Sequence, residues 1–223
     1  MVSWLSRKKY PDCWLEYSNH FKNQKKTDLQ HIRFIVFDTE TTGLNTKNDR
    51  ILSIGAISII GNMMDVADSL DIYVKQDKFN SKTVKIHGLL KEGNIQKIEE
   101  IEAVIQFLQY IKNSVLIAHH ADFDITMINN ALKRMQLPKL KNKFLDTGVL
   151  IKKTKFHDPS KKHYSLDSLC EIFNINMHDR HTAAGDAYIT GLIFLKILSA
   201  IKKDKSNFTL DQLFFNSNRR GLL

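Results

Sequence analysis

The chain has 223 residues, of which 43% are hydrophobic, and this is enough for one compact domain with extensions. Lys and Arg number 33 against 24 Asp and Glu, and the net charge of +9 favours a polyanionic partner without separating nucleic acid from membrane lipid. Two cysteines, Cys13 and Cys170, are too few for a disulfide framework or a zinc cluster. No run approaches the roughly 18 apolar residues of a membrane span and no signal peptide is visible, so we expect a soluble cytoplasmic protein that binds no membrane.

The composition along the chain predicts three parts. Residues 1–29 are expected to form an N-terminal helical appendage and linker, because the amphipathic stretch CWLEYSNHF precedes the polar run KNQKKTD. Residues 30–205 form the main domain, and residues 206–223 a short C-terminal helix and tail. We expect Trp14 and Phe21 to pack on the main domain, with docking on a partner as the alternative.

The first half of the main domain is predicted to be mostly strand. RFIVFD, RILSIGAISII and LDIYVKQ are rich in β-branched and aromatic residues and read as three strands, the last two separated by the turn-prone GNMMD. A helix is predicted over residues 95–112, where apolar side chains recur at helical spacing. These are Ile98, Ile101, Ile105, Leu108 and Ile111.

Strands and helices alternate in the second half. SVLIAHH predicts another buried strand, and the following apolar spacing predicts a helix that ends before Pro138. KFLDTGVLIKKT is a strand end or the first turn of a helix, SLDSLCEIF is a short helix capped by Ser165, and a long helix is predicted over residues 182–203. The order of these elements predicts an α/β fold, a mixed β-sheet flanked by helices on both faces.

Two acidic residues stand at the end of the first predicted strand, in FDTETTGL. Residues i and i+2 of a strand face the same way, about 6.5 to 7 Å apart, so Asp38 and Glu40 would repel each other on one face. A cation between them would relieve this repulsion, and hard oxygen ligands favour Mg²⁺ or Mn²⁺ over zinc. The alternative is a solvated strand end without any ion.

Two further acids and a histidine extend this pattern. Asp124 lies at the start of the helix that follows SVLIAHH, where Asp122 is better placed as the helix cap. Asp186 lies among small residues in HTAAGDAYITG, which would let its helix approach the sheet closely. On the loop before that helix, His181 would be placed to accept a proton from water.

The ordered stretches FDTETTGL, HHADFD and HTAAGD resemble the three motifs of the DEDDh 3′-to-5′ exonucleases, the family of the proofreading epsilon subunit of bacterial DNA polymerase III. The resemblance covers residues 33 to about 200. It implies a ribonuclease-H-like fold, two divalent metals per site, Mg²⁺ or Mn²⁺, and release of nucleoside 5′-monophosphates from a free 3′ end. Matched to the motifs, the metal carboxylates are Asp38, Glu40, Asp124 and Asp186, and the general base is His181.

The resemblance also implies a substrate-binding segment. Thr41, Thr42 and Gly43 match residues that approach the terminal nucleotide, and Leu44 would pack against the last bases. His87, in IHGLL, would lie near the terminal sugar or phosphate. The chain departs from the family at His120, where Asn is common, so a hydrogen bond at the second motif is expected to differ. His119 is expected to be structural.

Basic clusters suggest how a nucleic acid would be held. KLKNK, KKTK and the pair Lys161 and Lys162 flank the second and third motifs, and together they predict a groove that tracks phosphates, although any one cluster alone reads as a solvated surface. Near the C-terminus, QLFF is faintly similar to sliding-clamp-binding peptides. Packing of Phe214 and Phe215 on the domain is the expectation we prefer.

We therefore expect a metal-dependent 3′-to-5′ exonuclease acting on single-stranded or frayed DNA 3′ ends, in proofreading or repair. The alternatives are an RNA exonuclease or oligoribonuclease, and a nucleic-acid-binding module that has lost catalysis. A polymerase or a sliding clamp is the expected protein partner.

Overall fold

The computed structural model describes residues 10–22, 28–77, 95–204 and 208–214. Its centre is a five-stranded sheet in the order β3-β2-β1-β4-β5. The strands are β1 (Arg33–Thr41), β2 (Ile51–Ile60), β3 (Met63–Tyr73), β4 (Val115–Ala118) and β5 (Phe144–Asp146). β1, β2 and β3 pair antiparallel, whereas β4 is parallel to β1 and β5 is parallel to β4. The predicted mixed sheet is confirmed.

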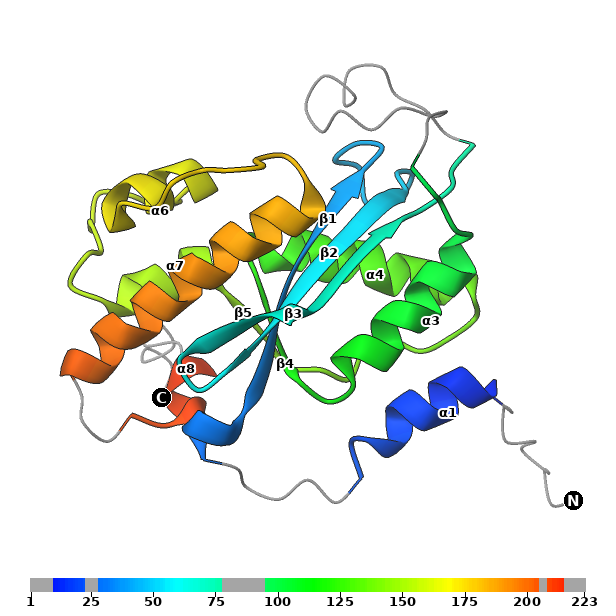
Figure 1. The fold of residues 1–223 in the computed structure, drawn as a ribbon, viewed down its shortest axis with the longest axis horizontal. Coiled ribbons are helices and arrows are strands. Elements are labelled where there is room, and N and C mark those ends of the chain that lie inside the picture. The colour runs from blue at the N-terminus through cyan, green and yellow to red at the C-terminus, as the bar shows by residue number, and fades with distance from the viewer. Residues whose placement is uncertain (1–9, 23–27, 78–94, 205–207, 215–223) are drawn as a thin grey trace, which may run out of the picture.

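Helices cover both faces of this sheet (Figure 1). On one face lie α3 (Glu100–Ile111) and α4 (Ala121–Arg134), with α1 (Asp12–Asn19) against α3. The other face is covered by α5 (Thr147–Leu150), α6 (Leu166–Phe173), α7 (Ala183–Asp204) and α8 (Leu210–Phe214). Single 3₁₀ turns occupy Leu29–His31 and Ile151–Lys153. Side chains of β1 point alternately to the two faces and so divide the core into two clusters. Ile35 and Phe37 join the cluster beneath α1, α3 and α4, whereas Phe34 and Val36 join the cluster beneath α5 to α8.

The N-terminal segment packs on the domain, as expected. Trp14 is 3% exposed and, with Tyr17, belongs to the same core cluster as α3, while Phe21 packs against that cluster. The Tyr17 hydroxyl also donates to Asn142 Oδ1 at 2.7 Å. These contacts tie α1 to the segment that leads into β5.

The third strand begins earlier than predicted. Met63 and Met64 already pair with Ile60 and Ile59, so GNMMD is mostly strand and the turn is the pair Gly61 and Asn62, with Gly61 in the left-handed region at φ 64°. β3 is an edge strand with exposed side chains and a register shift opposite Ile57 and Ser58. An exposed edge strand shows little apolar alternation, so the sequence pattern did not reveal the first half of β3.

The predicted helix over residues 95–112 is also shorter in the structure. α3 begins at Glu100, because the segment before it is extended and Ile98 forms a bridge with Val74. Ile101 is 59% exposed, and the buried face consists of Ala103, Val104, Phe107, Leu108 and Ile111. The apolar spacing therefore predicted the helix correctly, but of the residues expected on its buried face only Leu108 and Ile111 are buried there.

α7 is the one helix within the described residues that is long and apolar enough to cross a membrane by length and composition. It lies instead against β1 and β2, and its residues Ile193, Phe194 and Ile197 are buried in the core. Its apolar character is that of a core helix.

Candidate active site

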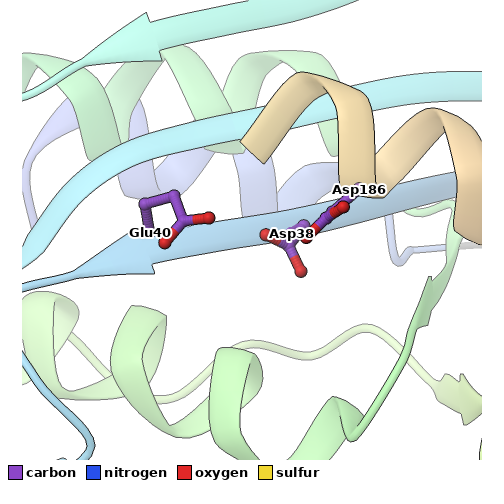
Figure 2. A group of neighbouring side chains, drawn as sticks. All are labelled: Asp38, Glu40 and Asp186. Atoms are coloured by element: carbon purple, nitrogen blue, oxygen red, sulfur yellow. The ribbon is translucent and has the colours of Figure 1, made fainter. Parts of the chain in front are cut away.

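Three carboxylates meet beside the C-terminal half of β1. Figure 2 shows Asp38 and Glu40 on β1 and Asp186 in the first turn of α7, and one oxygen from each lies within 4.8 Å of the others. Asp38 and Glu40 share one side of the strand, as the alternation predicts. An all-oxygen donor set of this kind fits a hard divalent cation, so the fold and the chemistry of this cluster suit a metal centre.

A glycine on β2 lets α7 reach the cluster. Gly55 pairs with Asp38, and a Cβ atom at Gly55 would lie 2.2 Å from the backbone of Ala183 and Ala184. The start of α7 therefore rests directly on the strand backbone, and Asp186 is brought to the side of Asp38. The small residues of α7 were predicted to allow this approach, but the glycine on the facing strand was missed.

Gly55→Ala is expected to destabilise the protein by about 3 kcal/mol or more, because two backbone segments would have to separate. Gly191→Ala is the matched control, since the nearest atom to its Cβ is the flexible end of the Met64 side chain. Urea unfolding of both variants measures the difference. Equal stabilities would show that the contact at Gly55 does not position α7.

Asp124 borders the cluster but is held by β1. Its Oδ1 accepts hydrogen bonds from the Thr39 backbone N–H at 3.0 Å and the Thr39 hydroxyl at 2.6 Å. Asp124 is not one of the three residues whose oxygens lie within 4.8 Å of one another. It is buried, and its charge raises the pKa of both Asp38 and Glu40, so it belongs to the same electrostatic site.

The start of α4 is capped differently from the prediction. Asp122 is exposed and makes no cap; instead Asp146, at the end of β5, accepts from the Ala121 N–H at 3.0 Å and from the Gly148 N–H at 2.7 Å. The residue before the helix is His120, in the left-handed region at φ 57°. Asn and His both adopt this conformation more often than most residues do, so His120 can take the place of the Asn that is common in the family.

His119 has the structural role that was expected. It is buried, and its Nδ1 lies 2.8 Å from the Thr147 hydroxyl. Burial, with a contribution from the neighbouring His120, lowers the pKa of His119 to about 4. A neutral imidazole therefore links the end of β4 to α5.

His181 lies on the loop before α7, as required if it is to face the cluster. It is exposed and adopts the left-handed region at φ 65°. The preceding residue, Arg180, was not predicted as part of the site. Its Nη1 donates to both oxygens of Asp186, at 2.6 and 2.5 Å, and the same side chain bonds Asp167.

The segment after β1 forms a closed loop. The register shifts at Glu40 and Thr41, and Asp49 then accepts from the Thr42 hydroxyl at 2.9 Å and the Asn45 N–H at 2.9 Å. A Cβ at Gly43 would lie 2.6 Å from Asp49 Oδ2, which accounts for the glycine. Asp49 organises this loop, and its only sequence signal was an acid close after the first motif.

The predicted substrate residues lie on this loop with different exposures. Thr41 donates to the Gly43 carbonyl at 2.8 Å, Thr42 is fully buried, and Leu44 is 86% exposed. His87 lies outside the described residues.

The carboxylates have strongly altered proton affinities in the metal-free protein. Burial is the main cause, and it raises the pKa of Glu40 to about 8 and that of Asp124 to about 7. Burial and the charges of Asp124, Asp186 and Glu40 raise the pKa of Asp38 well above its ordinary value. The cluster is therefore costly to ionise without a cation, which is the behaviour of a site built to receive one.

The metal-free protein is expected to lose stability as pH rises from 6.5 to 8. The unfolded chain has already released these protons, whereas the native Asp124 holds its proton up to about pH 7 and Glu40 up to about pH 8. Below its native pKa, each of the two carboxyl groups therefore lowers stability by up to about 1.4 kcal/mol per pH unit. His119 opposes this loss near pH 6.5, because its lowered pKa makes stability rise with pH until the unfolded imidazole has lost its proton, and its contribution fades above that value. Thermal melts in EDTA and in Mg²⁺ measure both effects; a flat EDTA profile would contradict the raised pKa values.

The basic clusters are distributed differently from the prediction. Lys139–Lys143 precedes β5, and the Lys143 carbonyl accepts from the Leu116 N–H at the N-terminal ends of β4 and β5. This is the end of the sheet away from the cluster, because the carboxylates follow the C-terminal half of β1, which is parallel to β4. Lys152 Nζ donates to the Lys162 carbonyl at 2.9 Å, so the cluster KKTK lies next to the pair Lys161 and Lys162. The predicted groove would have to rest on these two alone.

The C-terminal helix, α8, packs against the core of the domain. Leu213 is buried and Phe214 packs against the core, with the Lys143 ammonium 5.2 Å from its ring centre. Phe215 lies outside the described residues. The Gln212 side chain accepts from the Thr209 N–H at 3.0 Å, as in the predicted capping box.

Solved structures share this arrangement of sheet and helices. Exonuclease X in complex with 5′ overhanging duplex DNA matches with a TM-score of 0.60 and 23% identity, over 82% of this chain and 96% of that one. Exonuclease I from E. coli in complex with a dT13 oligonucleotide matches with a TM-score of 0.66 and 16% identity, over 79% of this chain and 43% of that one. The fold is that of the ribonuclease-H-like exonucleases.

Sequence comparison agrees with the fold. The profile of the RNase_T family, described as "Exonuclease", matches residues 35–194. The PolC-type DNA polymerase III of Caldanaerobacter subterraneus is 36% identical over 172 residues, 76% of this chain but 12% of that polymerase. The DNA polymerase III subunit epsilon of Buchnera aphidicola is 33% identical over 171 residues, 73% of this chain and 71% of that subunit. The chain belongs to the RNase_T exonuclease family.

Proposed function

We propose that this protein is a metal-dependent 3′-to-5′ exonuclease that releases nucleoside 5′-monophosphates from single-stranded or frayed DNA 3′ ends, in proofreading or repair. The observation that carries the proposal is the meeting of Asp38, Glu40 and Asp186 within 4.8 Å on rigid elements of an exonuclease-family fold. Residues 30–205 are the proposed exonuclease domain.

Four carboxylates would hold the ions, two Mg²⁺ or two Mn²⁺. Asp38, Glu40 and Asp186 present their oxygens to one space, and Asp124 supports them from the side. When bound, the ions would activate water and neutralise the charge that develops on the phosphate. Because Asp124 Oδ1 is engaged by Thr39, the second oxygen of Asp124 is the one available to a ligand or to water.

His181 is the proposed general base. Its exposed position on the loop before α7 leaves the ring accessible to water and substrate, and a ring nitrogen can accept the proton that the attacking water loses. His181 precedes α7, whereas Asp186 lies in the first turn of that helix. The base and the ligands thereby lie on separate elements.

The loop after β1 is the proposed site for the terminal nucleotide. Leu44 is exposed and can pack against a base, while Thr41, Thr42 and Gly43 shape the backbone beneath it. The rigid bonds of Asp49 would preorganise this loop before the substrate arrives. We also assign His87 to the sugar or phosphate, as the motif resemblance implies.

DNA is the preferred substrate because relatives of this chain are DNA polymerase III proteins and two of the solved structures that it resembles are exonucleases in complex with DNA. The same relatives support association with a polymerase, and cytoplasmic action follows from such a role. An RNA exonuclease is the alternative, since the same chemistry cleaves RNA and discrimination rests on contacts with the 2′-OH.

A time course with 5′-labelled single-stranded DNA and RNA of one sequence, with Mg²⁺ and with Mn²⁺, tests this proposal. We expect a descending ladder on DNA at a rate at least tenfold above that on RNA, a threshold we set for a clear preference. A ladder on RNA alone would replace the proposal with the alternative. Binding without a ladder on either strand would leave a nucleic-acid-binding module.

A further inference from the structure

Arg180 makes an unusual set of bonds for a residue beside a metal-type carboxylate cluster. Its Nη1 donates to both oxygens of Asp186, while its Nε and Nη2 donate to Asp167 Oδ1 at 2.8 and 2.7 Å. The Arg180 side chain is 19% exposed and that of Asp186 10%. Both oxygens of one cluster member are therefore taken by a guanidinium.

The backbone around Arg180 fixes this arrangement. Its neighbours Asp179 and His181 both adopt the left-handed region, at φ 54° and 65°. The Thr182 hydroxyl donates to the Asp179 carbonyl at 2.7 Å, and a Cβ at Gly185 would lie 2.1 Å from that carbonyl oxygen. The turn is thus packed against the first turn of α7, and the Arg180 side chain spans from Asp167 to Asp186.

The charge of Arg180 reaches the whole cluster. Burial and the neighbouring carboxylates raise the pKa of Asp38 and Glu40, and Arg180 acts in the opposite direction on both. Its charge therefore favours the ionised form of both carboxyl groups. In the metal-free protein it supplies part of the positive charge that a bound ion would supply.

From these contacts, and resting on the proposed function, we infer that Arg180 is a resident counter-cation of the metal centre. It holds Asp186 while no ion is bound and gives up at least one Asp186 oxygen when an ion binds, remaining attached to Asp167. An ion must displace a charge-assisted pair to bind Asp186, so Arg180 lowers the affinity of the site. It also stabilises the metal-free fold, because it gives the largely buried Asp186 carboxylate a charged partner.

Arg180→Gln tests this inference, with Arg134→Gln as the matched control. Arg134 also binds a carboxylate through two nitrogens, with Nε and Nη2 each 2.7 Å from an oxygen of Glu100, on α3 and α4 away from the cluster. Both variants lose one positive charge. Isothermal titration with Mn²⁺ and thermal melts with and without Mn²⁺ are run on the wild type and both variants.

We expect Arg180→Gln to bind Mn²⁺ about tenfold more tightly than the wild type, while Arg134→Gln binds as the wild type does. We also expect the loss of melting temperature in Arg180→Gln to disappear at saturating Mn²⁺, whereas any loss in Arg134→Gln persists. Unchanged or weaker Mn²⁺ binding by Arg180→Gln would overturn the inference. A wild-type protein that binds no Mn²⁺ would instead remove the metal centre itself, so the two failures are distinguishable.

Discussion

Asp38→Asn is expected to lower nucleotide release by at least about 10⁴-fold and, at the same time, to raise the melting temperature of the metal-free protein. The loss of rate is expected because the cluster would lose one of its proposed metal ligands, and with it a negative charge that would attract the ions. The gain in stability follows because Asp38 has its pKa raised by burial and by three neighbouring carboxylates, so its ionised form is a cost to the fold.

Asp122→Asn is the control for this experiment. Asp122 is exposed on α4, two residues before Asp124, and its carboxylate is outside the cluster. Release of labelled nucleotide and melting temperature in EDTA are measured at pH 8 for both variants. If Asp38→Asn retained its rate, or if it lost stability in EDTA, the reading of this cluster as a metal centre would be wrong.

His181→Ala is expected to reduce kcat by about 10² to 10⁴-fold, the range that general-base catalysis supplies. Its affinity for Mn²⁺ should stay within about twofold of the wild type, because His181 lies on the loop before α7 and is not among the clustered carboxylates. Single-turnover cleavage measures the chemical step, and titration with Mn²⁺ measures the site.

His178→Ala provides the matched control, since His178 is also exposed and lies on the same loop. It should retain the wild-type rate. A parallel loss of metal affinity in His181→Ala would identify His181 as part of the metal site, and a full rate in that variant would remove it as the base.

The strand alternation and the motif order were enough to predict the centre of the site. Asp38 and Glu40 had to share a face once β1 was recognised, and the small residues around Asp186 indicated a helix that lies close to the sheet. The first prediction depends on strand periodicity and the second on small residues close together in the chain, and a sequence displays both directly. The mixed sheet followed from the order of strands and helices in the same way.

The contacts that surround the site could not be predicted from local pattern. Gly55 matters because another element rests on it, and Arg180 because its side chain reaches two acids on different helices. Asp146 caps a helix that lies 25 residues earlier in the chain, in place of the nearby Asp122. The contacts of Gly55 and Asp146 join elements that are distant in the sequence, and those of Arg180 depend on how the turn before α7 folds.

The most direct test of the account is a crystal of the protein grown with Mn²⁺ and measured for anomalous scattering. We predict two peaks about 4 Å apart, the separation typical of two-metal sites, between Asp38, Glu40 and Asp186, with Asp124 beside them. The Arg180 guanidinium should have left at least one oxygen of Asp186. An empty cluster in crystals saturated with Mn²⁺, or peaks bound elsewhere on the protein, would contradict the account.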